Sequence, residues 1–255
     1  SGFEAALVLV ADGSGSSFRS DEGRLCTEAT SLYVARRGRL EPLHLERVQA
    51  HLADLSTLGF VFEHVTRKAG FVTTVGPNVR FAEAGKLMGL AAYGGPQTNW
   101  MRWFQPVDGA PRVTVSAYDI FLEIAALEKR YDNGEGKAYF RPWLVDLAHK
   151  VQQELEDALV HIVGVALEQT GLGHLCMAGG IALNSVANYH ILRSCPLDDI
   201  FAFPAAGDNG IAAGCALWAY GNLEGGTQRS RLRTATLGRA PAEEESAEAI
   251  KGYED

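Results

Sequence analysis

The sequence of residues 175–214 is LCMAGGIALNSVANYHILRSCPLDDIFAFPAAGDNGIAAG, and its pattern decides the fold. An apolar run ends at Gly179-Gly180 and is followed by Asn184 and Asn188 at helical spacing. A second apolar run ends in PAAGDNG (204–210), and a helix of small residues is expected after it. Each turn therefore joins a strand to a helix. Ligands of open α/β sheets bind at that end of the strands, where glycines permit close approach and helix N-termini offer N–H donors to anions.

The rest of the chain continues this alternation of apolar strands and amphipathic helices. Leu43, Val48, Leu52, Leu55 and Phe60 form an apolar stripe that predicts a helix over 43–70. The expected strands are 5–11, one or two within 19–37, 173–178 and 199–203, and the other expected helices are a short one within 81–95, 143–171, 182–193 and 209–221. Such alternation predicts an α/β fold, with mixed sheets covered by helices.

The first strand begins almost at the first residue and ends in a glycine turn. It reads AALVLVA (5–11), and such an apolar strand needs cover on both faces. We therefore expect the natural protein to begin well upstream of Ser1. Asp12-Gly13-x-Gly15 follows, and we interpret it as a tight hairpin whose backbone amides could hold a phosphate.

Composition and charge exclude several classes of protein. The formal net charge of −8 argues against a broad basic surface for nucleic acid. No apolar stretch approaches the ~20 residues of a membrane span, and no signal peptide opens the chain. The four cysteines show no CxxC pairing, which favours reduced thiols in a cytoplasmic protein. Residues 222–255 are polar and rich in Gly and Glu, as is typical of a linker.

Five segments together resemble one protein family. They are LVLVADGSGSS, TLGFVFEHVTRKAGF, EAGKLMGLAAYG, CMAGGIALNSVAN and FPAAGDNGIAAGCAL, in this order along the chain. The sequence resembles the nodulation-protein U / cephalosporin carbamoyltransferase family of O-carbamoyltransferases over roughly residues 5–220. The resemblance implies an actin/hexokinase/sugar-kinase (ASKHA) fold, with two related lobes that close on a nucleotide. Residues 1–221 would be part of that domain, with its first lobe incomplete.

The resemblance also assigns roles to residues of the glycine turns. In that superfamily the turn with Gly13 and Gly15 is the second phosphate-binding element, and the turn with Gly179 and Gly180 binds adenosine. Asn184 would donate a hydrogen bond from the first helical turn, although simple helix capping is the alternative. Lys86 could neutralise a phosphate or carboxylate, or it could be a solvated surface charge.

Asp12 and Asp208 match two of the family's metal ligands. The metal in the family is iron, and carboxylates suit such a cation because they bind it without releasing a proton. Asp12 could instead only cap its turn, and Asp208 could be the N-cap of the helix over 209–221. The family's other ligands are an H-x-x-x-H pair upstream of the strand at 5–11, and this sequence does not contain it. The catalytic base stays unassigned.

The reaction implied is carbamoyl transfer from carbamoyl adenylate, made from carbamoyl phosphate and ATP in a downstream YrdC-like domain. The linker over 222–255 would lead towards that domain. The acceptor would be a hydroxyl of a small-molecule natural product, and the protein could be a homodimer. Alternatives are a non-catalytic or split nucleotide-binding lobe, an ASKHA-type small-molecule kinase, and the related tRNA threonylcarbamoyl-transfer or hydrogenase-maturation proteins. We expect the chain by itself to have little or no transferase activity.

Overall fold

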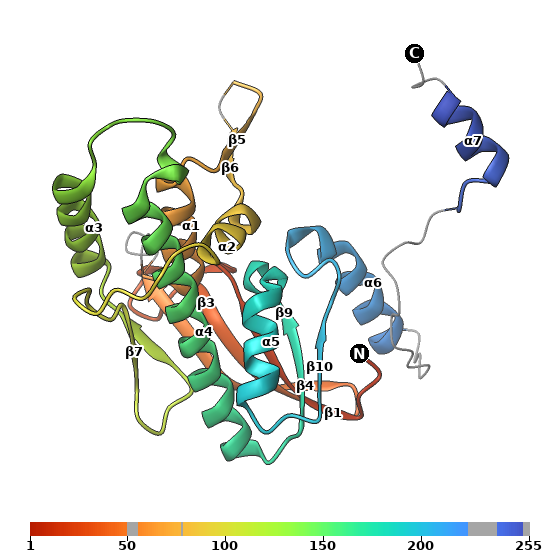
Figure 1. Cartoon of the computed structure of the whole chain (residues 1–255). Helices are drawn as coiled ribbons and strands as arrows, with labels where there is room; N and C mark the ends of the chain where they lie inside the picture. Colours follow the sequence, from red (N-terminus) through yellow and green to blue (C-terminus); the bar gives the residue numbers. More distant parts are fainter. Residues whose placement is uncertain (50–55, 78, 224–238, 252–255) are drawn as a thin grey trace.

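The computed structural model describes residues 1–49, 56–77, 79–223 and 239–251. Its main sheet runs through the centre of the molecule (Figure 1) and has six strands, with the path β10-β9-β1-β3-β2 and with β4 also paired to β3. The strands are β1 (Ala5–Ala11), β2 (Ser17–Arg19), β3 (Leu25–Arg36), β4 (Arg39–Gln49), β9 (His174–Ala178) and β10 (Asp199–Ala202). One such sheet corresponds to one lobe of the expected fold.

The half of this sheet from β10 to β1 is parallel, and the sheet has one fully buried face. β1 pairs parallel with β9, β9 pairs parallel with β10, and β1 pairs antiparallel with β3. Side chains alternate between the two faces of a strand. Leu7 and Leu9 are therefore fully buried opposite Leu175 and Met177 of β9, whereas Val8 and Val10 are half-buried on the other face. The parallel pairing brings the carboxyl ends of β1, β9 and β10 to one edge.

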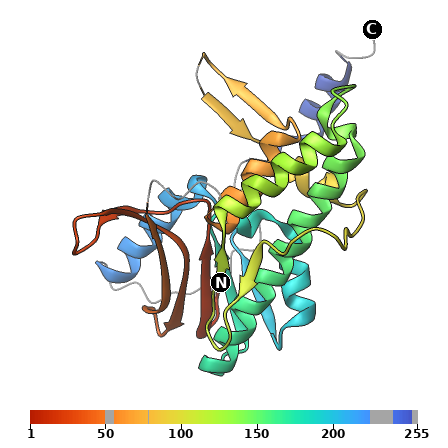
Figure 2. The same cartoon turned by 90° about the vertical axis from the view of Figure 1, so that its left-hand side faces the viewer.

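A layer of helices covers the buried face (Figure 2). Its centre is α4 (Pro142–Thr170), which packs against α1, α2 and α5. Pro142 occupies its first turn, where a missing N–H costs nothing, and Gly171 ends it with a φ of 65°. The other helices of this layer are α1 (Leu58–Lys68), α2 (Ala84–Ala91), α3 (Ala117–Tyr131) and α5 (Ser185–Ser194).

The remaining elements are small or lie outside the core. β5 (Val72–Val75) and β6 (Val79–Ala82) form one hairpin, and β7 (Phe104–Pro106) and β8 (Val113–Val115) form another. Short 3₁₀ turns occupy η2 (Ala138–Phe140), η3 (Gly180–Leu183) and η4 (Asp208–Gly210). α6 (Ile211–Asn222) and α7 (Glu243–Lys251) have no buried residue. None of the helices among the described residues has the length and apolarity needed to cross a membrane.

The prediction of one helix over 43–70 is wrong in its first part. Residues 39–49 form β4, an edge strand antiparallel to β3, and the helix α1 begins only at Leu58. The reversal lies at Arg37-Gly38, where both residues have positive φ (51° and 81°) between the paired Arg36 and Arg39. Such a two-residue turn matches the strand twist and sets up the hairpin. Leu52 and Leu55, two members of the apolar stripe, lie outside the described residues.

The other expected elements are confirmed at nearly the expected bounds. The strand at 5–11, the short helix within 81–95, the helix at 143–171 and the β-α-β-α order after it are all present. The tight hairpin at Asp12 is wrong. β1 and β2 are both antiparallel to β3, so the chain runs in the same direction in both strands. The residues between them therefore do not reverse the chain, as a hairpin would. Of the tail, residues 224–238 and 252–255 lie outside the described residues.

Candidate functional site

Asp12 connects the two glycine turns at the carboxyl edge of the sheet. Its Oδ1 accepts a hydrogen bond from Gly13 N at 2.7 Å, and its Oδ2 accepts one from Gly180 N at 2.7 Å. The parallel register that pairs Val10 with Ala178 brings these turns side by side, although they are 168 residues apart in the chain. The carboxylate therefore closes its own turn through Oδ1 and holds that turn against the second through the charge-assisted hydrogen bond from Gly180 N to Oδ2.

Two glycines allow the elements around Asp12 to approach this closely. Gly179 has a φ of 89°, and a Cβ there would lie 2.2 Å from Ala11 O. A Cβ on Gly59, at the start of α1, would lie 2.4 Å from Gly13 N. Thr57 caps α1 by accepting from Phe60 N at 3.1 Å and also donates to Gly13 O at 2.8 Å. Backbone contact at both points requires residues without a side chain.

The predicted phosphate donors are engaged within the protein. Gly13 N and Gly180 N donate to Asp12, Gly15 N donates to Glu28 O at 2.6 Å, and Gly179 N donates to Ala206 O at 2.8 Å. In this structure these glycines therefore let a ligand approach the backbone closely, but their N–H groups already have acceptors. Their role in nucleotide binding stays a prediction.

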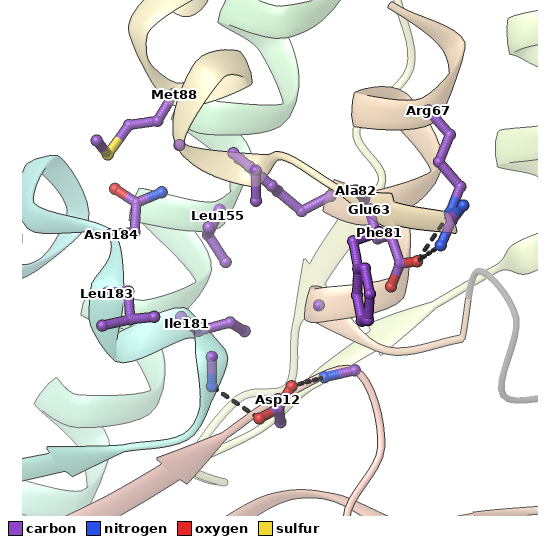
Figure 3. A pocket seen from close by; sticks show the side chains of 16 residues that line it. Asp12, Glu63, Arg67, Phe81, Ala82, Met88, Leu155, Ile181, Leu183 and Asn184 are labelled. Atoms are coloured by element: carbon purple, nitrogen blue, oxygen red, sulfur yellow. Dashed lines mark hydrogen bonds and ion pairs between the residues drawn. The ribbon is translucent and has the colours of Figure 1, made fainter. Parts of the chain in front are cut away.

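A first cavity of about 460 Å³ opens on the α1 side of Asp12. Its walls come from the Asp12 turn, α1, β6, α2, α4 and η3, and they are mainly apolar (Figure 3). Side chains that line it include Phe62, Glu63, Arg67, Phe81, Met88, Leu155, Ile181, Leu183 and Asn184. The volume falls within the range of about 300–1,000 Å³ that is typical of small-molecule sites.

Apart from the Asp12 carboxylate, the charges that line this cavity neutralise each other. Arg67 Nε and Nη2 both donate to Glu63 Oε1, at 2.8 and 2.6 Å, one helical turn apart on α1. Arg67 Nη2 also donates to Arg80 O of β6 at 3.1 Å. Glu63, Arg67 and Phe81 were not among the predicted site residues. The spacing of four in FEHVTR indicates an ion pair, but nothing in the sequence indicates that a cavity surrounds it.

A second cavity of about 410 Å³ lies on the other side of Asp12 and is more acidic. Asp12, Glu28 and Asp208 line it, together with Ser14 and the partly buried Tyr33. The structure thus brings both predicted metal ligands, Asp12 and Asp208, to one cavity. Asp208 does not cap α6, because that N-cap is Gly210 and no side chain bonds there.

These carboxylates do not amount to a complete metal site. Within the described ranges, no three His, Cys, Asp or Glu side chains lie close enough together to hold an ion. Both oxygens of Asp12 also accept N–H bonds. The residues present therefore do not by themselves fit the expected iron, and we derive no step of a reaction through it.

Asn184 has structural partners in addition to its place at the first cavity. Its Oδ1 caps α5 by accepting from Ala187 N at 3.0 Å, and its amide pairs reciprocally with Gln152 of α4, at 2.8 and 3.1 Å. It is 8% exposed. The capping alternative is thus present in the structure, while a hydrogen bond from Asn184 to adenosine stays a prediction.

Lys86 lies on α2 next to the first cavity without lining it. Its Nζ contacts Glu83 Oε2 at 2.7 Å, and its side chain is 59% exposed. This lysine therefore forms a surface ion pair here, which contributes little to stability. Contact with a phosphate would require the side chain to turn away from Glu83.

The sheet order and the paired glycine turns at its carboxyl edge define an α/β domain of the ASKHA class. The solved structures support this fold. A full-length HypF in a phosphate- and nucleotide-bound form superposes with a TM-score of 0.52 over 89% of this chain and 41% of that chain, at 13% identity. HypF of T. kodakarensis gives 0.50 over 88% of this chain and 35% of that chain, at 17% identity.

The chain belongs to the family described as Carbamoyltransferase N-terminus, whose model matches residues 16–217. An uncharacterized protein of Synechocystis is 30% identical over 84% of this chain and 33% of its own length. Nodulation protein NolNO of Sinorhizobium fredii is 28% identical over 93% of this chain and 31% of its own length. Nodulation protein NolO of Bradyrhizobium diazoefficiens is 32% identical over 58% of this chain and 27% of its own length. The chain therefore spans about a third or less of each of these relatives.

Proposed function

We propose that this chain forms the nucleotide- and acceptor-binding part of an O-carbamoyltransferase. The donor is carbamoyl adenylate, formed elsewhere in the longer protein from carbamoyl phosphate and ATP, and the acceptor is a hydroxyl of a small-molecule natural product. Membership of the carbamoyltransferase family supports the chemistry. The observation that carries the assignment of sites is the position of Asp12, which lines both cavities.

The nucleoside of the donor belongs in the first cavity. Its lining is mainly apolar and its one ion pair, Glu63 with Arg67, is internally neutralised, which suits an uncharged heterocycle and ribose. Gly180 and Asn184 line the same cavity, in accordance with their predicted roles.

The acceptor belongs in the second cavity, which offers carboxylates and hydroxyls to a polyhydroxylated molecule. In the transfer, the acceptor oxygen bonds to the carbamoyl carbon, the bond from that carbon to the phosphate oxygen breaks, and AMP leaves. The acceptor proton passes to a base that stays unassigned. The protein's contribution is to hold the two reactants on either side of the Asp12 turn, which replaces an encounter in solution by a fixed geometry.

A divalent metal, iron in the family, would add charge neutralisation at the phosphate. Asp12 and Asp208 are the residues of this chain proposed to contact it, with further ligands from the rest of the longer protein. Nucleotide binding without transfer is the second candidate function, favoured by the lack of a complete ligand set among the described residues. Cytoplasmic location and a homodimer also stay predictions.

Calorimetric titration of ATP and AMP, with and without Fe²⁺, tests the proposal. We expect binding that tightens with Fe²⁺, and loss of that gain in Asp208→Ala, with the exposed Asp21→Ala as the matched control. Absence of nucleotide binding would contradict the site. Turnover of carbamoyl phosphate and ATP by this chain alone would contradict the expectation that it needs the remainder of the longer protein.

A further inference from the structure

The β5–β6 hairpin places an aromatic side chain where it contributes little to folding. The hairpin forms its own two-stranded sheet and projects from the body in both Figure 1 and Figure 2. Phe81 of β6 is 57% exposed. A large aromatic ring stabilises a fold mainly through its burial, so Phe81 contributes little to the stability of this fold.

Phe81 nevertheless lies at a defined place, because the hairpin is tied down on both sides of it. Arg67 Nη2 donates to the carbonyl of Arg80, and the same guanidinium pairs with Glu63 on α1. Glu83 N, two residues after Phe81, donates to Phe71 O at 3.0 Å. The backbone on both sides of Phe81 is therefore held in place relative to α1.

The ring lines the first cavity and is directed into it. Figure 3 shows Phe81 beside Glu63, on the opposite side of the cavity from Met88 and Leu183. The available surface is one aromatic face, aliphatic groups across from it, an ion pair without net charge, and the Asp12 carboxylate at the first glycine turn. This combination suits a flat, uncharged, polarisable ring, since aromatic rings stack favourably on such groups.

We propose that Phe81 stacks on the base of the bound nucleotide, and that Arg67 is a positioning residue that holds Phe81 there. The inference rests on the proposed function, because it takes the first cavity as the nucleoside site. It adds the β5–β6 hairpin to the binding surface and assigns a contact for the base, beyond the two glycine turns.

The test is calorimetric titration of AMP and of ribose 5-phosphate, which lacks the base. Alanine substitution of a stacking aromatic weakens base binding about 5- to 100-fold. We expect a weakening in this range for AMP with Phe81→Ala, and near wild-type affinity with Phe81→Trp. Val75→Ala is the matched control, because Val75 is 55% exposed on the same hairpin and does not line the cavity. Ribose 5-phosphate should not distinguish Phe81→Ala from wild type.

The outcomes separate this inference from the proposed function. If wild type binds AMP and Phe81→Ala binds it within about twofold, the stacking role is wrong and the nucleotide site stands. An equal loss of AMP affinity in Val75→Ala would also overturn it, because the effect would then belong to the hairpin as a whole. If wild type binds no AMP, both the nucleotide site and the stacking role fail.

Discussion

Replacement of Gly179 by alanine tests the close approach of the two strands that carry the site. The backbone at Gly179 has a φ of 89° and a ψ of 166°, a region that is essentially restricted to glycine and costs other residues about 1–3 kcal/mol. The added Cβ would lie 2.2 Å from Ala11 O and 3.0 Å from Ala11 N. β1 or the Gly179 turn must therefore move, at a further cost of roughly 1–3 kcal/mol.

We expect Gly179→Ala to lower the free energy of unfolding by about 2–6 kcal/mol. The matched control is Gly164→Ala within α4, where no atom lies within 4 Å of the new Cβ. That change should stabilise the protein by about 0.5–1 kcal/mol, because alanine restricts the unfolded chain more than glycine does. The assay is urea unfolding followed by circular dichroism. A value for Gly179→Ala within about 1 kcal/mol of wild type would refute the close contact with β1.

Three further changes test other parts of the structure. Asp12→Ala removes two hydrogen bonds to a charged acceptor at a partly exposed site, so thermal unfolding should show a loss of about 2 kcal/mol, with no loss for the exposed Asp21→Ala. Glu154→Ala leaves Trp103 N and Phe104 N without their acceptor and removes the carboxylate partner of Lys150, whose Nζ keeps its bond to Met101 O. Urea unfolding should show a loss of about 3 kcal/mol, and a change below about 1 kcal/mol would contradict this. Burial raises the pKa of the Cys195 thiol to about 11. Iodoacetamide at pH 8 should therefore label the exposed Cys215 long before Cys195, and peptide mass spectrometry would detect this order. Because this folded pKa lies above the unfolded one, the contribution of Cys195 to stability is complete below pH 9 and is lost as the pH rises towards 11.

The local sequence pattern was sufficient to predict secondary structure in those segments that have one strong periodicity. The run AALVLVA predicts a buried strand, and the apolar positions of 143–171 recur at helical spacing over about eight helical turns. Both elements were therefore predicted at nearly the observed bounds, although the face of β1 with Val8 and Val10 is only half-buried. The glycine turns after β1 and β9 were also visible in the sequence. The parallel pairing of β1 with β9, which was not predicted from the sequence, then brings Asp12 beside Gly180.

In the segment 43–49 the local sequence pattern was insufficient to distinguish a strand from a helix. Leu43 and Val48 fit a helical stripe, but they also fit an edge strand, and β4 tolerates Pro42 because an edge strand need not donate on both sides. The Arg37-Gly38 turn decides between the two, by delivering this segment alongside β3. Pairing between strands is a tertiary interaction, and it overrides a weak helical preference.

The α/β fold, the glycine turns and the carboxylates within them could be predicted from local sequence, because they depend on periodicity and on backbone conformations that few residues adopt. That Asp12 joins the two turns, through the bond from Gly180 N to its Oδ2, became clear only from the folded chain. The tertiary structure also decided that Glu63, Arg67 and Phe81 face a cavity. A cavity is bounded by elements distant in the chain, here the Asp12 turn, α1, β6, α2, α4 and η3, so its lining depends on how they pack and leaves no local signal in the sequence.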